Sequence, residues 1–144
     1  MGKVQLELLE KDGFYLSVTE GISMRPMIKS GRDIMKVSKL SDLPKRYDIV
    51  MYIRDVDQGV IHRVIRKEQD AYIICGDNCW ALERVRPEQI KGIVTEFYRK
   101  DKWHKTDEFG YRLYVHVWTD LLFIRRPLFY MRDKIRRWIR RVSG

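Results

Sequence analysis

The chain has 144 residues, which is enough for one domain with a single hydrophobic core. Lysine and arginine total 29 against 20 aspartates and glutamates, giving a formal net charge of +9, and a hydrophobic content of 44% excludes a disordered basic tail. Cys75 and Cys79 are the only cysteines, too few for a small secreted protein held by disulfides. The N-terminal sequence has no apolar signal stretch, so we expect a cytoplasmic location.

The first hundred residues have the pattern of short strands. Residues 4–11 fit either a short helix or a strand. From residue 14 onward, runs of β-branched and aromatic residues alternate with turn sequences, which predicts a mainly β body. The expected strands are 14–19, 34–37, 48–54, 60–66, 71–75 and 90–98. The segment 55–59 (DVDQG) predicts a hairpin turn, in which Gly59 can adopt a positive φ.

After residue 101 the hydrophobic period becomes that of helices. Residues 111–124 predict a first helix. A second, amphipathic helix is predicted beyond it, with Pro127 suited to its first turn and arginines between its apolar positions. Those apolar positions are Leu128, Met131, Ile135, Trp138, Ile139 and Val142. We therefore expect a β domain over residues 1–100 and a basic helical C-terminal extension over 101–144.

The basic helix has two interpretations. An apolar side flanked by arginines can lie in an anionic membrane interface, which predicts peripheral contact with the cytoplasmic face of a membrane through residues 127–144. The apolar side can equally pack on the β body and leave the arginines solvated. A transmembrane helix is not expected, because no stretch has the ~20 apolar residues that it needs. A nucleic-acid partner is not expected either, because the charge lies on one helix without a known binding module.

Three segments place a polar side chain in a setting suited to chemistry. The sequence GISMRP puts Ser23 in a rigid bend, which can expose the hydroxyl and direct backbone N–H groups at a carbonyl, although serine is also common in ordinary turns. The sequence VIHRVI places His62 in an apolar strand, as a hydrogen-bonded structural residue or a general base. The sequence CGDNC puts Asp77 in a turn, from which a carboxylate can orient an imidazole.

In this order and with these flanks, the three residues resemble the signal peptidase and LexA-like serine peptidase clan, in particular the Ser-His-Asp branch found in the endoplasmic-reticulum signal peptidase. The resemblance covers residues 21–95, about half of the chain. The matching segments are GISMRP at 21–26, SGRD at 30–33, YDIV at 47–50, IHRVI at 61–65, GDN at 76–78 and IKGIV at 90–94. The resemblance implies a coiled β-sheet body, which here would carry the helical extension.

The resemblance also implies a role for each residue. Ser23 would be the acylating nucleophile, and its own backbone N–H would help to bind the oxyanion. His62 would be the base, at the position where bacterial signal peptidases and LexA-like proteins have lysine. Asp77 would orient His62, with Asp33 as the alternative acid. The implied activity is that of a serine endopeptidase, which cleaves a protein or a leader- or signal-type peptide through an acyl-enzyme.

The chain departs from the family pattern in four respects, two of which alter turns: Arg32 is inserted before Asp33, and the glycine before Asp48 is absent. Ile22 precedes the nucleophile where many relatives have serine or glycine, and the family's membrane-spanning anchor has no counterpart. A non-catalytic peptide-binding or membrane-docked regulator with the same fold is the alternative function, although a binding module has no need for all three residues. The Cys-x₃-Cys spacing of Cys75 and Cys79 is poor for zinc, so no metal and no cofactor are predicted.

Overall fold

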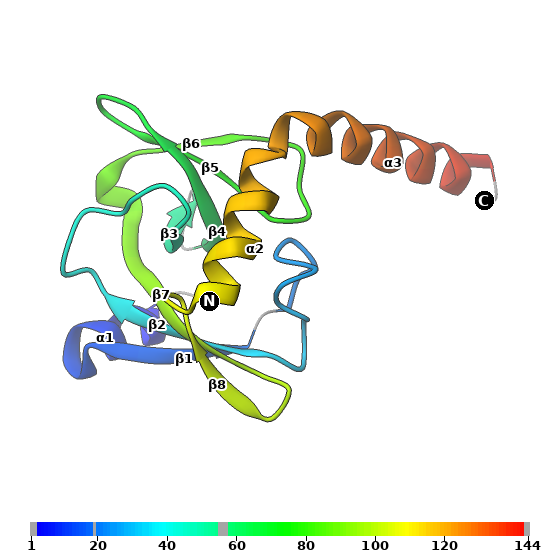
Figure 1. Cartoon of the computed structure of the whole chain (residues 1–144). Helices are drawn as coiled ribbons and strands as arrows, with labels where there is room; N and C mark the ends of the chain where they lie inside the picture. The colour runs from blue at the N-terminus through cyan, green and yellow to red at the C-terminus, as the bar shows by residue number, and fades with distance from the viewer. Residues whose placement is uncertain (1–2, 19, 55–57, 143–144) are drawn as a thin grey trace.

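An antiparallel sheet of eight strands forms the body of the protein (Figure 1), as described by a computed structural model for residues 3–18, 20–54 and 58–142. The strand order is β1-β2-β7-β3-β4-β5-β6, and β8 pairs with β7. The strands are β1 (Phe14–Val18), β2 (Ile34–Lys39), β3 (Ile49–Arg54), β4 (Gln58–Lys67), β5 (Tyr72–Cys75), β6 (Glu83–Val85), β7 (Ile90–Arg99) and β8 (Lys102–Lys105). The predicted mainly β fold with a C-terminal helix is confirmed.

The position of each strand in the sheet decides how its side chains are buried. β1 lies at one edge, and its residues alternate between buried and exposed, so that Leu16 and Val18 face solvent. β4 lies between β3 and β5 and is buried over residues 61–65. Because successive side chains of a strand point to opposite faces, His62 and Arg63 are both inside the protein but on different sides of β4.

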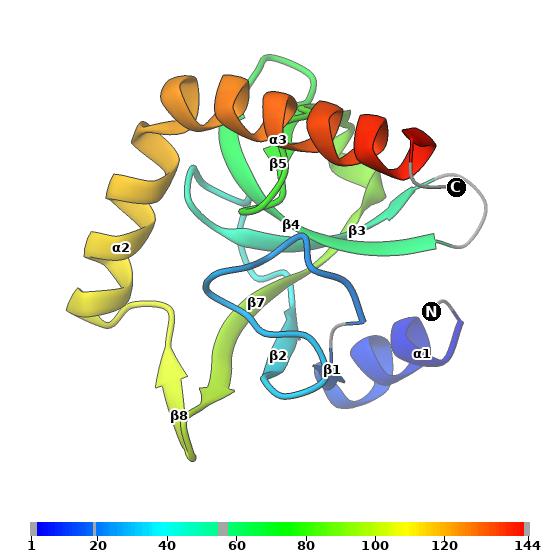
Figure 2. The same ribbon diagram turned by 90° about the vertical axis from the view of Figure 1, so that its right-hand side faces the viewer.

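Three α-helices and one short 3₁₀ helix accompany the sheet. The segment 4–11, left open between helix and strand, lies in α1 (Lys3–Asp12), which packs Leu9 into the core. The extension contains α2 (Phe109–Asp120) and α3 (Leu122–Val142), while the 3₁₀ helix η1 spans Pro87–Gln89. α2 stands beside the sheet, and the C-terminal part of α3 projects away from it (Figures 1 and 2). Among the described residues, no helix combines the length and apolarity needed to cross a bilayer.

The start of the last helix differs from the prediction. α3 begins at Leu122, so Pro127 lies inside the helix and not in its first turn. A proline at this place removes one main-chain hydrogen bond of the helix. Arg125 fixes the preceding turn, because its guanidinium donates to the carbonyls of Trp118 and Asp77. Of the predicted hairpin turn at 55–59, residues 55–57 lie outside the described residues, and the other two begin β4.

Candidate active site

The bend that carries Ser23 is held by hydrogen bonds to the loop after β5. The backbone N–H of Asn78 donates to the Ser23 carbonyl at 2.7 Å, and the Asn78 side-chain amide donates to the Ile22 carbonyl at 3.2 Å. Met24 and Met27, which follow the serine, are buried in the core. Ser23 itself is half-buried. The backbone on both sides of Ser23 is therefore held in place, while Ser23 itself remains partly exposed to solvent.

His62 lies next to this bend. A Cβ atom built on Gly76 would be 2.8 Å from the Ser23 carbonyl oxygen and 3.1 Å from His62 Nε2. Both atoms therefore lie so close to position 76 that only glycine, which has no side chain, can occupy it without displacing them. The Ser23 carbonyl and the His62 ring, which are far apart in the chain, thus both lie close to Gly76.

The other nitrogen of His62 faces a carboxylate that the sequence analysis missed. His62 Nδ1 is 3.3 Å from Glu83 Oε1 and 3.3 Å from the Tyr52 hydroxyl oxygen. Because Tyr52 donates its own proton to Glu83 at 2.8 Å, the neighbours of Nδ1 act as acceptors. This pattern favours a proton on Nδ1 and leaves Nε2, on the Ser23 side, free to accept one.

Glu83 is ionised in this setting. Partial burial acts to raise the pKa of its carboxyl, but hydrogen bonds from His62, Tyr52 and Arg54 outweigh this and lower the pKa to about 2. Arg54 donates to both carboxylate oxygens, through Nε to Oε2 at 2.9 Å and through Nη2 to Oε1. Burial and the bond to Glu83 also raise the pKa of Tyr52, which keeps its proton. The acid beside His62 is therefore a fixed negative charge.

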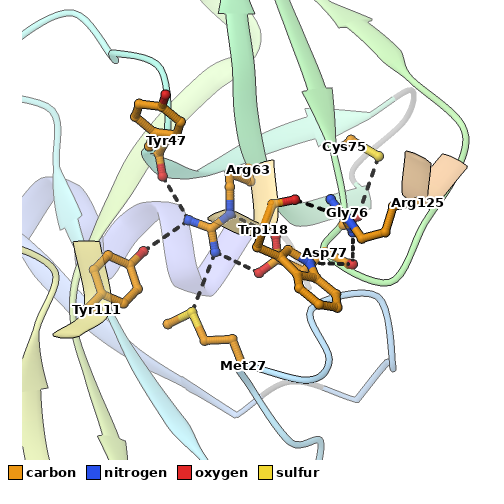
Figure 3. A network of polar contacts seen from close by, with 9 residues as sticks. All are labelled: Met27, Tyr47, Arg63, Cys75, Gly76, Asp77, Tyr111, Trp118 and Arg125. Carbon is orange, nitrogen blue, oxygen red and sulfur yellow. Dashed lines mark hydrogen bonds and ion pairs between the residues drawn. The ribbon is translucent and has the colours of Figure 1, made fainter. Parts of the chain in front are cut away.

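The Asp77 carboxylate does not contact His62, which corrects the expected pairing. Arg63 donates to both of its oxygens, from Nε and Nη2, at 2.7 Å each (Figure 3). Both side chains are 1% exposed. Burial opposes the charge of Arg63, but the attraction of Asp77 outweighs it and raises the pKa of the guanidinium. His62 and Arg63 face opposite sides of β4, so a carboxylate bound to one is turned away from the other.

Arg63 and Asp77 form the centre of a wider buried network. Arg63 also donates to the Tyr47 carbonyl at 2.8 Å and to the Tyr111 hydroxyl at 3.1 Å. The Asp77 carbonyl accepts hydrogen bonds from Trp118 of α2, at 2.9 Å, and from Arg125 of α3 (Figure 3). Asp77 thus joins the sheet, the loop behind the serine and both helices of the extension.

The alternative acid, Asp33, is also engaged elsewhere. It accepts hydrogen bonds from the Lys29 backbone N–H at 2.9 Å and from Arg32 Nε at 2.7 Å. Burial acts to raise the pKa of its carboxyl, but these bonds prevail and lower it. Asp33 therefore closes the turn before β2, and no contact with His62 places it in the candidate site.

Both cysteines are free thiols, and one of them lies close to the candidate site. Burial raises the pKa of Cys75 to about 12, and its thiol donates to backbone carbonyls. Cys79 Sγ would be 2.8 Å from a Cβ on Gly76, so it shares the surroundings of His62 Nε2. Burial raises the pKa of Cys79 as well, which opposes formation of a reactive thiolate. Among residues 3–18, 20–54 and 58–142, no group of His, Cys, Asp and Glu has the arrangement of a metal site.

Comparison with known proteins identifies no relative from which a role could be transferred. Neither the protein-family models nor the curated proteins contain a match to this chain. The sequence analysis missed three residues around His62, namely Tyr52 and Arg54 of β3 and Glu83 of β6. The sequence does indicate a buried partner for Arg63, because an arginine inside an apolar strand needs a buried acceptor such as Asp77. The functional assignment therefore depends on the geometry of the site.

Proposed function

We propose that this protein is a serine endopeptidase of the signal peptidase and LexA-like type, in which Glu83 takes the role of the orienting acid. The observation that carries the proposal is the arrangement around His62. Its Nε2 lies beside the Ser23 bend at Gly76, and its Nδ1 faces the Glu83 carboxylate at 3.3 Å. This is the order of nucleophile, base and acid that acyl transfer through a serine requires.

The reaction would proceed by two acyl transfers. Ser23 Oγ attacks the carbonyl carbon of the scissile peptide bond while His62 Nε2 takes the hydroxyl proton. The C–N bond then breaks, and His62 returns the proton to the leaving amine. A water molecule attacks the acyl-enzyme, with His62 again as the base, and releases the second product. The Ser23 backbone N–H would stabilise the negative charge on the carbonyl oxygen.

The substrate we propose is an extended segment of a protein or of a leader- or signal-type peptide. β1 is the edge strand that leads into the Ser23 bend, and an extended chain can add to such an edge by main-chain hydrogen bonds. We place the reaction in the cytoplasm, because a reducing compartment keeps thiols such as Cys75 and Cys79 free. The alternative, a peptide-binding regulator with the same fold, shares the substrate but lacks the covalent step.

Covalent labelling tests the proposal. A fluorophosphonate probe is expected to attach to Ser23 of the purified protein, and mass spectrometry of the digested protein would locate it. Ser23→Ala and His62→Ala should remove the labelling, whereas Cys79→Ala should retain it, because the Cys79 thiol is not the nucleophile. Equal labelling of the wild type and Ser23→Ala would leave the binding module as the function. Labelling that disappears only in Cys79→Ala would assign the nucleophile to the cysteine.

Gly76 provides a second test of the site. In Gly76→Ala the new methyl group would collide with the Ser23 carbonyl, a backbone atom that cannot rotate away, and would approach His62 Nε2. We expect the labelling rate at Ser23 to fall at least tenfold. Gly110→Ala is the matched control, because Gly110 is in α2 and has no heavy atom within 4 Å of a new Cβ. Equal labelling rates in the two variants would contradict the close approach of serine and histidine.

A further inference from the structure

We infer that α3 is a membrane-surface helix, which binds anionic lipid bilayers through an apolar stripe that faces away from the protein. The inference concerns binding and does not depend on the proposed peptidase activity. It follows from the side of the helix that contacts the body, from the exposure of the opposite side, and from the charges along the edges.

The helix contacts the body through arginines, through Leu122 at its start, which packs with Ile65 and Ile73, and through the ring of Tyr130, which lies edge-on to Trp80 at 5.1 Å between centroids. Arg126 donates to the Trp80 carbonyl at 2.9 Å, and Arg132 donates to the side-chain oxygen of Asn78 at 2.6 Å. Arg132 also lies over the ring of Phe129, at 4.4 Å from its centroid. An amphipathic helix docked on its own protein normally turns its apolar side inward, whereas most of the apolar residues of α3 are exposed.

The apolar side of α3 is left in solvent. Its members recur at intervals of three and four residues, which aligns them along one side of the helix. Each is between 48% and 66% exposed, and together they are Ile124, Leu128, Met131, Ile135, Trp138, Ile139 and Val142. The docking of this stripe on the β body, which was the alternative interpretation of the sequence, is therefore wrong. A helix of 21 residues is about 31 Å long, so the stripe is a large unpartnered apolar surface.

The charges beside the stripe select an anionic partner. α3 has eight basic residues and one acidic residue, Asp133, which is paired with Arg132. In the described part of the chain, Lys134, Arg136 and Arg140 have no acidic partner. Cations around an apolar stripe with an exposed tryptophan match a bilayer surface, where the headgroups are negative and the acyl chains lie just beneath.

A second copy of the chain fits the same stripe less well. The alternating steps of three and four from Ile124 to Val142 also occur in coiled coils, so apolar spacing alone does not separate the two partners. In a coiled coil, however, four of the six flanking positions would be basic, namely Arg125, Arg132, Lys134 and Arg141, and the other two would be Pro127 and Ile139. Two such helices would bring like charges together without any acidic residue to pair them. The charge pattern therefore favours lipid over self-association.

Binding through α3 would also bring the candidate active site close to the bilayer. Arg132 of α3 holds Asn78, and Asn78 in turn holds the carbonyls of Ile22 and Ser23. A single residue, Asn78, thus links the lipid-binding helix to the serine bend. This consequence rests on the proposed function, since it assigns the peptidase to substrates at the membrane surface.

Flotation with lipid vesicles tests the inference on the full-length protein. We expect the protein to float with vesicles of phosphatidylglycerol and phosphatidylcholine and to remain unbound with vesicles of phosphatidylcholine alone. Raising the salt concentration from 0.1 M to 1 M should weaken the binding, because it shortens the screening length from ~10 Å to ~3 Å. Trp138 should enter an apolar environment, so a blue shift of fluorescence should occur in the wild type and be lost in Trp138→Phe.

Variants distinguish lipid binding through the stripe from non-specific hydrophobic binding and from catalysis. Ile135→Ser combined with Trp138→Ser should weaken vesicle binding at least tenfold, and Arg136→Gln with Arg140→Gln should do the same on anionic vesicles. These side chains are exposed, so the variants should keep the fold. Leu43→Ser is the matched control, because Leu43 is an exposed apolar residue outside the extension, at 64% exposure, and binding should not change. Ser23→Ala should bind as the wild type does, whatever becomes of its labelling.

Three results would overturn the inference. The first is unchanged flotation after substitution of the stripe, and the second is the absence of binding to anionic vesicles. The third is a stable dimer in analytical ultracentrifugation that Ile135→Ser dissociates, which would assign the stripe to a second copy. Loss of serine labelling with normal vesicle binding would contradict the proposed function and leave the membrane helix in place.

Discussion

Replacing Glu83 by glutamine is expected to slow acylation of Ser23 by roughly 10⁴-fold, while the protein remains folded. Glutamine can still accept hydrogen bonds from Tyr52 and Arg54 through its oxygen, but its amide would then donate to His62 Nδ1. The imidazole proton would move to Nε2, on the side of the serine, where a base needs an unprotonated nitrogen with a free lone pair. Labelling kinetics with a fluorophosphonate and circular dichroism would measure the two effects.

One control variant and one pH-dependence measurement make the Glu83 result specific. Glu96→Gln removes a carboxylate that is paired with Lys36 in another part of the sheet, and it should leave the labelling rate unchanged. The Glu83 carboxylate, which the Glu83→Gln variant lacks, should also stabilise the wild type in a pH-dependent way. The pKa of Glu83 falls from 4.5 to about 2 on folding, so its contribution is complete above 4.5 and is lost as the pH falls towards 2. The difference in stability between wild type and variant should therefore shrink in acid.

Removing the carboxylate of Asp77 is expected to destabilise the fold by about 3–5 kcal/mol. In Asp77→Ala the guanidinium of Arg63 would stay buried without its counter-charge, because the Arg63 side chain is only 1% exposed. The Tyr47 carbonyl and the Tyr111 hydroxyl would remain as neutral partners, which do not replace an ion. Urea denaturation at neutral pH would measure the loss in the free energy of unfolding.

A matched pair distinguishes this structural role from a catalytic one. Asp120→Ala removes an exposed carboxylate that pairs with Arg46, and it should cost no more than about 1 kcal/mol. Arg63→Met with Asp77→Leu removes both charges and should be less harmful than Asp77→Ala alone, since no ion is left unpaired. If Asp77→Ala were as stable as the wild type and unable to react with the probe, Asp77 and not Glu83 would be the acid of the site.

The body of the fold was predictable because its strands carry a local signal. Six strands were expected from runs of apolar residues, and each corresponds to a strand of the sheet. β8 was missed because its hairpin turns through Lys100 and Asp101, which both have positive φ although neither is a glycine. The break between α2 and α3 was displaced because Arg125 is fixed by carbonyls of Trp118 and Asp77, and this long-range contact outweighs the usual place of a proline.

The candidate site was only partly predictable, because the sequence shows residue types and not the faces they occupy. Ser23 and His62 were predicted to act together, and the Ser23 carbonyl and His62 Nε2 both lie close to Gly76. The choice of acid depends on alternation along β4, which turns His62 and Arg63 to opposite sides. Glu83 has no motif of its own and reaches His62 only through the pairing of β4, β5 and β6. The extension was predicted to be amphipathic, but the sequence does not show which side of its helix contacts the body.

The alternation along β4 also has an evolutionary consequence. One face of the strand carries His62, the base of the proposed reaction, and the other anchors the ion pair that holds the loops, so adjacent positions would be subject to different constraints. A change of proton acceptor at position 62, to an amine for example, leaves the Arg63–Asp77 pair untouched. The scaffold can in this way acquire new chemistry by single substitutions without first losing its ability to fold.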